Sequence, residues 1–188
     1  MKPCHILCTD GKVLSVSDFR KSEKQPIAVV FHINHNENTE GNGYAVYLWN
    51  LEPLSFADSI GVKQNTSADI TALDGFENTF ALLGARETSS PLAEKVFDLW
   101  RYGQSAYVPS VAQMRLLYHA KEQINPVIKM CGGDTLSVEA DDCWYWTSTE
   151  VNEQQTAKAW LYSMGSGTIH DTPKIQAHKS RAIITLRD

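Results

Sequence analysis

The sequence predicts an α+β fold, and three stretches carry that prediction. Residues 27–33 are a nearly continuous run of β-branched and aromatic side chains, which is typical of a strand. Residues 110–121 open with the Ser-x-x-Gln pattern of a capping box and continue with apolar residues at helical spacing. Residues 143–150 place three aromatic side chains before three small hydroxyl residues, which indicates a strand at the centre of a core.

Length and charge bound the function classes. The chain has 188 residues, of which 43% are hydrophobic and 21% charged, as expected of a soluble globular protein. A formal net charge of −5 without a cluster of Lys or Arg disfavours a nucleic-acid or anionic-membrane partner. No apolar run approaches the roughly 20 residues that span a bilayer, so we expect no membrane insertion.

Residues 1–33 are expected to form a small N-terminal β unit packed on a main domain of residues 34–188. Ile6–Cys8 and residues 12–16 flank Asp10-Gly11, a turn dipeptide, and predict two short strands. Residues 17–25 are expected to form a loop before the strand at 27–33. Residues 44–49 predict its hairpin partner.

The middle of the chain predicts helices. Ile70, Leu73, Phe76, Phe80 and Leu83 recur at spacings of three and four, which predicts an inward apolar face on a helix over 70–83. Ser90-Pro91 should begin a second helix that Gly103 ends. The helix that begins after Ser110 should end at Asn125-Pro126, with a short helix at 127–131 behind it. Residues 52–67 show no period and are expected to be irregular.

The last third predicts strands around the aromatic run. In a strand, Trp144 and Trp146 share one face and Tyr145 takes the other, so we expect the tryptophans to be interior. Residues 160–164 alternate as a second strand, 165–167 form a turn, and 181–186 form a last strand. Residues 150–155 and 168–179 are polar and are expected to be displayed at the surface.

Cysteines and acidic residues leave several alternatives open. Cys131 and Cys143 bracket a Gly-containing acidic loop and could be bridged, although reduced thiols are the default. Cys4, His5 and Cys8 lack a second ligand pair, and His32 and His35 flank a strand end, so zinc is disfavoured. Asp134, Glu139, Asp141 and Asp142 could bind calcium but lack its loop pattern, and a solvated loop is favoured. We therefore expect neither a metal nor a cofactor.

Three motifs in order give a resemblance to a known family. They are Asp74-Gly75-Phe76-Glu77-Asn78-Thr79, then Tyr107-Val108-Pro109-Ser110 with Gln113 and Leu117-Tyr118, then Trp144-Tyr145-Trp146-Thr147-Ser148-Thr149-Glu150. With Ala159-Trp160 and the closing Ser180-Arg181-Ala182-Ile183, they resemble C-type-lectin-like domains of a family of unknown function that includes the C-terminal domain of a collagen-like bacterial adhesin. Its wider relatives are formylglycine-generating enzymes and the variable proteins of diversity-generating retroelements. The resemblance covers about residues 70–187.

The resemblance implies a C-type-lectin-like, formylglycine-generating-enzyme-like fold and a recognition role in gut bacteria or their phages. It places ligand contacts just after the Trp-Thr-Ser-Thr motif and on the following hairpin, at Glu150, Asn152, Gln154, Trp160, Tyr162, Ser166, Thr168, His170, Asp171 and Lys174. The calcium-binding sugar motifs Glu-Pro-Asn and Trp-Asn-Asp are absent, and so are paired cysteines near the C-terminus. Calcium-dependent sugar binding and the oxidase chemistry are therefore disfavoured.

The leading hypothesis is a non-catalytic adhesion or receptor-binding module for a protein or glycan ligand. The alternative is a structural subunit of a phage virion or surface appendage, in which the same surface contacts copies of itself or neighbouring subunits. Ser110, Ser148 and His170 are not set in a nucleophile elbow, metal motif or phosphate loop, so we expect no enzyme. The first ten residues lack a signal-peptide pattern. The sequence thus predicts a virion-associated or cytoplasmic protein, or a cell-surface protein whose leader was removed.

Overall fold

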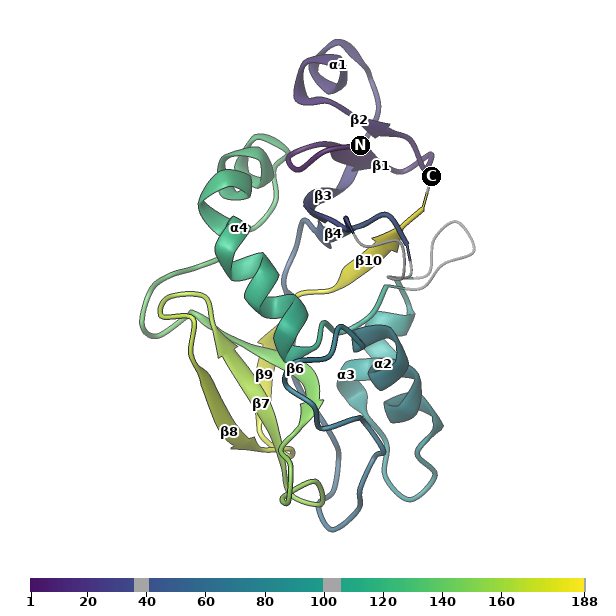
Figure 1. Cartoon of the computed structure of the whole chain (residues 1–188), viewed down its shortest axis with the longest axis vertical. Coiled ribbons are helices and arrows are strands. Elements are labelled where there is room, and N and C mark those ends of the chain that lie inside the picture. The colour runs from purple at the N-terminus through teal and green to yellow at the C-terminus, as the bar shows by residue number, and fades with distance from the viewer. Residues whose placement is uncertain (36–40, 100–105, 188) are drawn as a thin grey trace. The chain divides into compact units, whose positions relative to one another are not determined.

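The structure is a computed structural model that describes residues 1–35, 41–99 and 106–187. It is a mixed α+β fold with several antiparallel sheets, in agreement with the predicted class (Figure 1). The chain divides into two compact units. Unit 1 comprises Met1–Trp49, Leu116–Leu136 and Ile183–Asp188, and unit 2 comprises Asn50–Arg115 and Ser137–Ala182.

Unit 1 contains a five-stranded antiparallel sheet. Its strand order is β10-β4-β3-β1-β2, with bounds β1 Ile6–Cys8, β2 Val13–Leu14, β3 Pro26–Ile33, β4 Gly43–Tyr47 and β10 Ile183–Leu186. The predicted strands at 6–8, 27–33, 44–49 and 181–186 are confirmed to within two residues at each end. β3 pairs with β4, with Val29 opposite Val46, which confirms the predicted hairpin. The predicted domain boundary after residue 33 falls between these two paired strands.

The expected loop at 17–25 is partly wrong, because α1 spans Val16–Lys21. Ser15 caps this short helix: its hydroxyl accepts from the Asp18 N–H at 3.2 Å. The sequence carried this signal, a Ser followed three residues later by an acid, in a stretch where the charged residues suggested a loop.

The predicted break at Asn125-Pro126 is also wrong, because α4 runs without interruption over Val111–Met130. Pro126 is exposed, whereas Ile124 and Ile128 are fully buried on either side of it. A proline inside a helix removes one backbone hydrogen bond. Burial of the isoleucines four residues apart holds the helix together past that gap. Asn125 adds a further tie, since its side chain exchanges two hydrogen bonds with the backbone of Leu136.

Unit 2 contains two small sheets and two helices. A three-stranded antiparallel sheet has the order β6-β7-β8, and β5 pairs with β9. The bounds are β5 Leu51–Ser55, β6 Trp144–Glu150, β7 Lys158–Ser163, β8 Ile169–Pro173, β9 Ala177–Ser180, α2 Gly75–Gly84 and α3 Pro91–Phe97. The sequence predicted β6 and β7 but missed β5 and β9, and β8 falls in a stretch expected only to be polar.

The aromatic strand β6 is interior, as predicted, for two of its three rings. Tyr145 and Trp146 are fully buried, and the Trp146 Nε1–H donates to the Leu54 carbonyl of β5 at 2.9 Å. The Trp146 ring also packs on Phe56, with centroids 5.4 Å apart. Trp144 is only half-buried, so the expectation that both tryptophans are interior is wrong for that residue.

Helix α2 turns the opposite face inward from the one predicted. Phe76 and Phe80 are 40% and 41% exposed, whereas Asn78 and Thr79 are buried. The physical reason is backbone hydrogen bonding. Asn78 Oδ1 accepts from the Ser67 N–H, and the Thr79 hydroxyl accepts from the Val108 N–H. A helix that satisfies buried loop amides must turn polar residues towards them.

Both predicted helix caps in unit 2 are confirmed. Ser90 Oγ accepts from the Ala93 N–H at 3.1 Å, with Pro91 at the first helical position of α3. Ser110 Oγ accepts from the Gln113 N–H, and Gln113 Oε1 accepts from the Ser110 N–H. The predicted stop at Gly103 lies outside the described residues.

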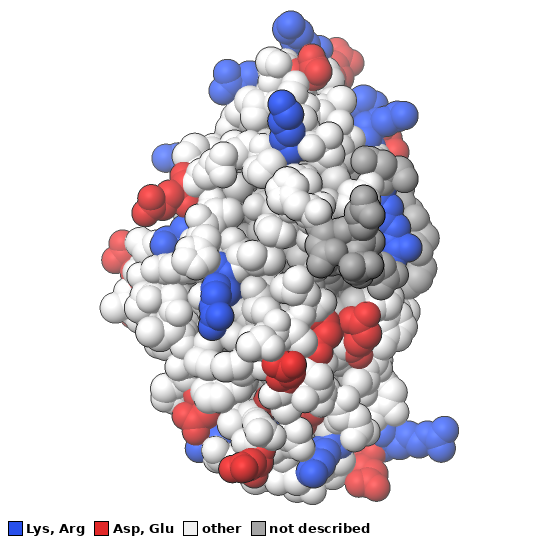
Figure 2. All heavy atoms as spheres, viewed as in Figure 1, with Lys and Arg blue, Asp and Glu red and all other residues white. Residues whose placement is uncertain are grey.

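All four cysteines are free thiols, so the alternative of a Cys131–Cys143 bridge is not realised. Within the described ranges, no group of three or more His, Cys, Asp or Glu side chains is arranged to hold a metal ion. None of the described helices is long and apolar enough to cross a bilayer. On the face shown in Figure 2, the described cationic and anionic side chains are interspersed.

Candidate functional site

The hydroxyl residues after the aromatic run belong to the core and organise the backbone around β6. Thr147, Ser148 and Thr149 are fully buried. The Thr147 hydroxyl donates to the Trp160 carbonyl at 2.8 Å, and Thr149 Oγ1 accepts from the Val111 N–H at the start of α4. Each hydroxyl therefore satisfies a polar group that the fold has removed from water.

Glu150 ends this strand and is fully buried, which contradicts its expected place on the displayed surface. Its Oε1 accepts from the N–H and the hydroxyl of Thr66, at 2.9 and 3.0 Å. Its Oε2 accepts from the Gln64 N–H at 3.1 Å and from Lys174 Nζ at 2.5 Å. The carboxylate is the acceptor that holds the irregular segment 64–66 against the sheet.

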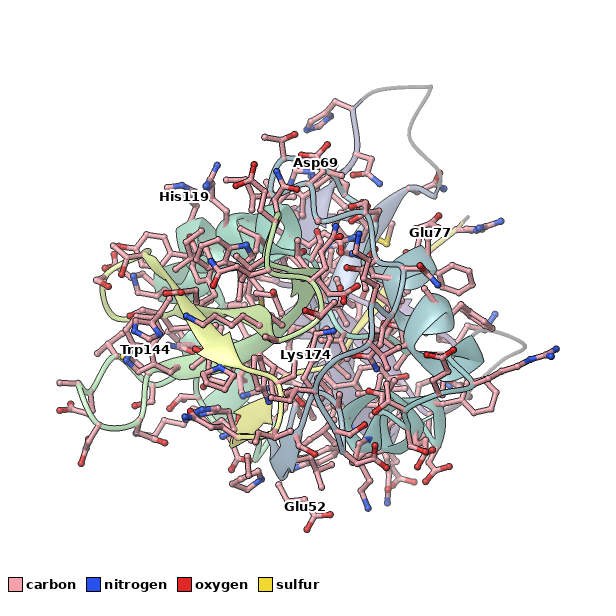
Figure 3. The ribbon with its side chains drawn as sticks, turned by 90° about the horizontal axis from the view of Figure 1, so that it is seen from below. Glu52, Asp69, Glu77, His119, Trp144 and Lys174 are labelled. Atoms are coloured by element: carbon pink, nitrogen blue, oxygen red, sulfur yellow. The ribbon has the colours of Figure 1, made fainter. Side chains whose placement is uncertain are left out.

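Lys174, which is labelled in Figure 3, was also expected at the surface and is also fully buried. Its Nζ donates to Glu150 and to the Val62 carbonyl, and lies 5.5 Å from the centre of the Phe56 ring. Burial lowers the pKa of Lys174, while the Glu150 carboxylate opposes that shift. A buried ion pair with this many partners is a structural element and is closed to a ligand.

An open groove lies elsewhere in unit 2, and it is the best candidate site. It has a volume of about 530 Å³ and is lined by β6, β7, β8, β9, the 140–142 loop and Pro53 of β5. Its volume falls within the roughly 300–1,000 Å³ of small-molecule pockets. The side chains that give it chemical character are Asp141, Asp142, Trp144, His170, His178 and Lys179.

Each of the two histidines that line the groove packs against a tryptophan: His170 against Trp144 of the lining, and His178 against the buried Trp146. The His170 ring meets the Trp144 ring edge-on with centroids 6.0 Å apart, and His178 meets Trp146 in the same way at 5.3 Å. His178 Nε2 contacts Gln176 Oε1 at 3.1 Å. Since an amide oxygen only accepts, this contact puts a proton on Nε2 and leaves Nδ1 of the neutral ring as an acceptor.

The orientation of His170 is fixed by the Thr172 hydroxyl. The Thr172 hydroxyl donates to the His170 carbonyl and contacts His170 Nδ1, both at 3.1 Å. Because the hydroxyl proton is already used, Nδ1 carries a proton, and Nε2 is left to face other partners. Burial, with a smaller contribution from the charge of His170, lowers the pKa of His178. The His178 imidazole is therefore neutral at physiological pH.

The ammonium group of Lys179 in the groove lining is paired with the carboxylate of Asp142. Lys179 Nζ donates to the Asp142 carboxylate at 2.6 Å and to the Asp142 carbonyl, and it lies 4.5 Å from the centre of the Tyr145 ring. The hydrogen bond from Lys179 is the main cause that lowers the pKa of Asp142. Asp141 is exposed beside this pair and contributes a further carboxylate to the groove.

The predicted ligand residues do not form one site. His170 lines the groove, whereas Asn152 and Trp160 line a second pocket of about 500 Å³ together with residues 67–70. Asp171 is paired with Lys158 at 2.8 Å, and Tyr162 is buried. Three of the others are exposed at the two turns, namely Gln154, Ser166 and Thr168.

Sequence reasoning missed most of the groove. Trp144 was assigned to the core, and Asp141 and Asp142 were weighed only as a calcium alternative. Gln176, His178 and Lys179 were passed over because β9 becomes a strand by pairing with β5, more than a hundred residues earlier, with Leu54 opposite His178. Residues 176–180 are polar apart from Ala177, so the stretch carries no local alternation that would predict a strand.

Comparison with known proteins gives one informative result. No family model matches the sequence, and no curated protein matches it. A solved structure of a fimbrial protein from Bacteroides ovatus has a similar fold, with a TM-score of 0.78 and 15% sequence identity. The similarity covers 99% of this chain and 49% of that one, so the chain spans about half the length of the fimbrial protein. At this identity the likeness shows a shared fold.

Proposed function

We propose that this chain is a non-catalytic ligand-recognition module of a surface appendage that acts in adhesion or receptor binding. The groove in unit 2 is the observation that carries the proposal. Its polar side chains come from β8, from β9 with Gln176 just before it, and from the 140–142 loop, and the half-exposed Trp144 of β6 lies among them. A rigid sheet that presents an aromatic ring beside hydrogen-bonding groups is an arrangement suited to binding. The fold shared with a fimbrial protein supports a place in an appendage.

The same residues argue for binding rather than catalysis. Neither histidine of the groove is oriented by a carboxylate or contacts a Ser or Cys nucleophile among the described residues. The Thr172 hydroxyl that meets His170 is committed to a backbone carbonyl. A nucleophile and base need mutual hydrogen-bond contact and a third orienting group. We accordingly propose no enzymatic role. The C-type-lectin-like assignment, with its implied phage or gut-bacterial setting, stays a prediction.

Adhesion of coated beads tests this proposal. Beads that carry the chain should adhere to at least one of a panel of immobilised mucin, extracellular-matrix proteins and intact cells. His170→Ala combined with Gln176→Ala should reduce that adhesion about tenfold or more, because both exposed side chains line the groove. Ser166→Ala with Thr168→Ala is the matched control at the β7–β8 turn. Loss in the control alone would move the site to that turn, and absence of adhesion would contradict the proposal.

A second candidate function is structural, and one observation favours it. Phe76, Phe80 and Phe97 pack on one another at the surface of α2 and α3, with ring centroids 4.8 and 6.3 Å apart, and each is about 40% exposed. Leu73 is exposed in the same part of the chain. Exposed apolar clusters of this kind mark subunit contacts in many proteins. Under this alternative, the chain is an appendage subunit whose aromatic cluster faces a neighbouring subunit.

A further inference from the structure

The groove discriminates among ligand classes by its charge. Among the described residues, Lys179 is the only Lys or Arg that lines it, and its ammonium is held by Asp142. The exposed Asp141 carboxylate stands in the same lining. The two carboxylates of Asp141 and Asp142 outnumber the one ammonium of Lys179 in this lining, so an anionic ligand would be repelled. An acidic sugar, a phosphate or a sulfate therefore does not suit this site.

Its hydrogen-bonding groups fit hydroxyls. His178 has a lowered pKa, and its Nε2–H is directed at Gln176, so Nδ1 is left as an acceptor. In His170, Nδ1 meets the Thr172 hydroxyl, so Nε2 is the ring nitrogen that a ligand hydroxyl can contact. Asp141 adds acceptor oxygens, and the Gln176 amide adds donors. Several planar acceptors beside a donor match a ligand whose hydroxyl groups both donate and accept.

The aromatic part of the lining supplies a stacking surface. Trp144 is half-buried, with His170 against it edge-on, and Leu161 and Thr172 are buried beside them in the lining. The face of an indole ring is electron-rich, so it packs favourably on the weakly positive C–H face of a pyranose. Figure 3 shows Trp144 well apart from the buried Lys174, on the part of the unit where the loop before β6 emerges.

We propose that the groove binds an uncharged saccharide, with a pyranose ring stacked on Trp144 and its hydroxyls hydrogen-bonded to His170, His178 and Asp141. This inference rests on the proposed recognition function and names the ligand class of that site. Binding needs no metal ion, because the groove residues themselves supply the acceptors.

A glycan array with neutral, sialylated, uronate and sulfated glycans tests the inference, followed by calorimetric titration of the best neutral oligosaccharide in the presence of a chelator. Wild-type protein should bind neutral glycans only. Trp144→Ala should weaken binding about tenfold or more, and Trp144→Phe should restore part of the affinity because the ring is retained. Trp49→Ala is the control, since Trp49 is exposed in unit 1 and outside the groove lining. Circular dichroism confirms that each variant is folded.

A charge reversal makes the test sharper. Asp141→Lys replaces an exposed carboxylate by an ammonium in the lining and should let acidic glycans bind while leaving the fold intact. Binding of acidic glycans by the wild type would overturn the inference. So would binding that does not change in Trp144→Ala. If no glycan binds but the bead adhesion to a protein surface depends on His170 and Gln176, the inference of a saccharide ligand is wrong and the proposed recognition function stands. If neither glycans nor coated surfaces are bound, both the saccharide inference and the recognition function are contradicted.

Discussion

Glu150 and Lys174 were predicted to lie at the surface because of the polar stretches around them, and the structure buries both. Both are polar residues in stretches that look like surface, and both lie at zero exposure because each satisfies the other together with backbone groups. The neighbouring residues in the sequence do not indicate whether a carboxylate is buried or solvated. Glu150 is buried because it binds residues of segment 62–66, which lies more than eighty residues earlier in the chain.

Removal of one member of this pair should be costly. Lys174→Met leaves a buried carboxylate without its cation, so we expect a loss of roughly 3–5 kcal/mol in the free energy of unfolding. Lys158→Met breaks the partly exposed pair with Asp171 and should cost less than about 1 kcal/mol. Urea unfolding of both variants measures the contrast. Equal losses would show that the Glu150–Lys174 pair is open to water.

The histidine of β9 gives a prediction about pH. Burial lowers the pKa of His178, so the folded state resists protonation more than the unfolded chain does. Between the ordinary value near 6.5 and the lowered value, the unfolded state binds more protons. The contribution of His178 to stability is therefore complete above about pH 6.5 and declines as the pH falls towards the lowered pKa. NMR titration of the ring C–H signals should give a pKa below that of the urea-unfolded chain, and His178→Gln should flatten the decline.

At the scale of elements, Gly75 explains why α2 lies where it does. A Cβ atom on Gly75 would stand 2.4 Å from Gln113 Oε1 and 2.6 Å from the Val108 carbonyl oxygen. The Gly75 N–H also donates to Gln113 Oε1, the oxygen that completes the capping box of α4. The first residue of one helix is thus packed against the start of another.

Two glycines of α2 make a matched pair for experiment. Gly75→Ala should destabilise the protein by about 1–3 kcal/mol through this crowding, although alanine is the better helix former. Gly84→Ala, in the same helix, meets nothing within 4 Å and should be neutral or stabilise by up to about 1 kcal/mol. Thermal unfolding measures both. A stabilising Gly75→Ala would show that the contact with Gln113 relaxes freely.

Local signals predicted the elements that depend on local physics. The caps at Ser90 and Ser110, the strand pair β3–β4 and the buried strand β6 follow from side chains close in sequence. The inward face of α2 could not be predicted from nearby residues, because Asn78 and Thr79 are buried by hydrogen bonds to Ser67 and Val108. The groove depends on β9, which forms a strand only because it pairs with the distant β5. The groove residues can be read from the sequence, but the sequence does not show that they lie together in space.

At the scale of the whole molecule, the oligomeric state separates the two candidate functions. If the aromatic cluster of α2 and α3 is a subunit contact, light scattering after size exclusion should show a concentration-dependent oligomer. Phe76→Ser with Phe80→Ser should then return it to the monomer without lowering the melting temperature by more than a few degrees, since both rings are partly exposed. A monomer at all concentrations contradicts self-assembly through this cluster and leaves the recognition module.

The burial of Lys174 also bears on how the protein can be handled. Amine-reactive dyes, biotin esters and activated sensor surfaces acylate lysines that water can reach, and Lys174 has no accessible surface. Labelling at the exposed lysines, such as Lys63 and Lys129, should leave the interior charge pair unmodified in the native protein. Mass mapping of tryptic peptides after mild acylation would then report the integrity of unit 2, because modification of Lys174 would appear only in molecules whose interior had opened.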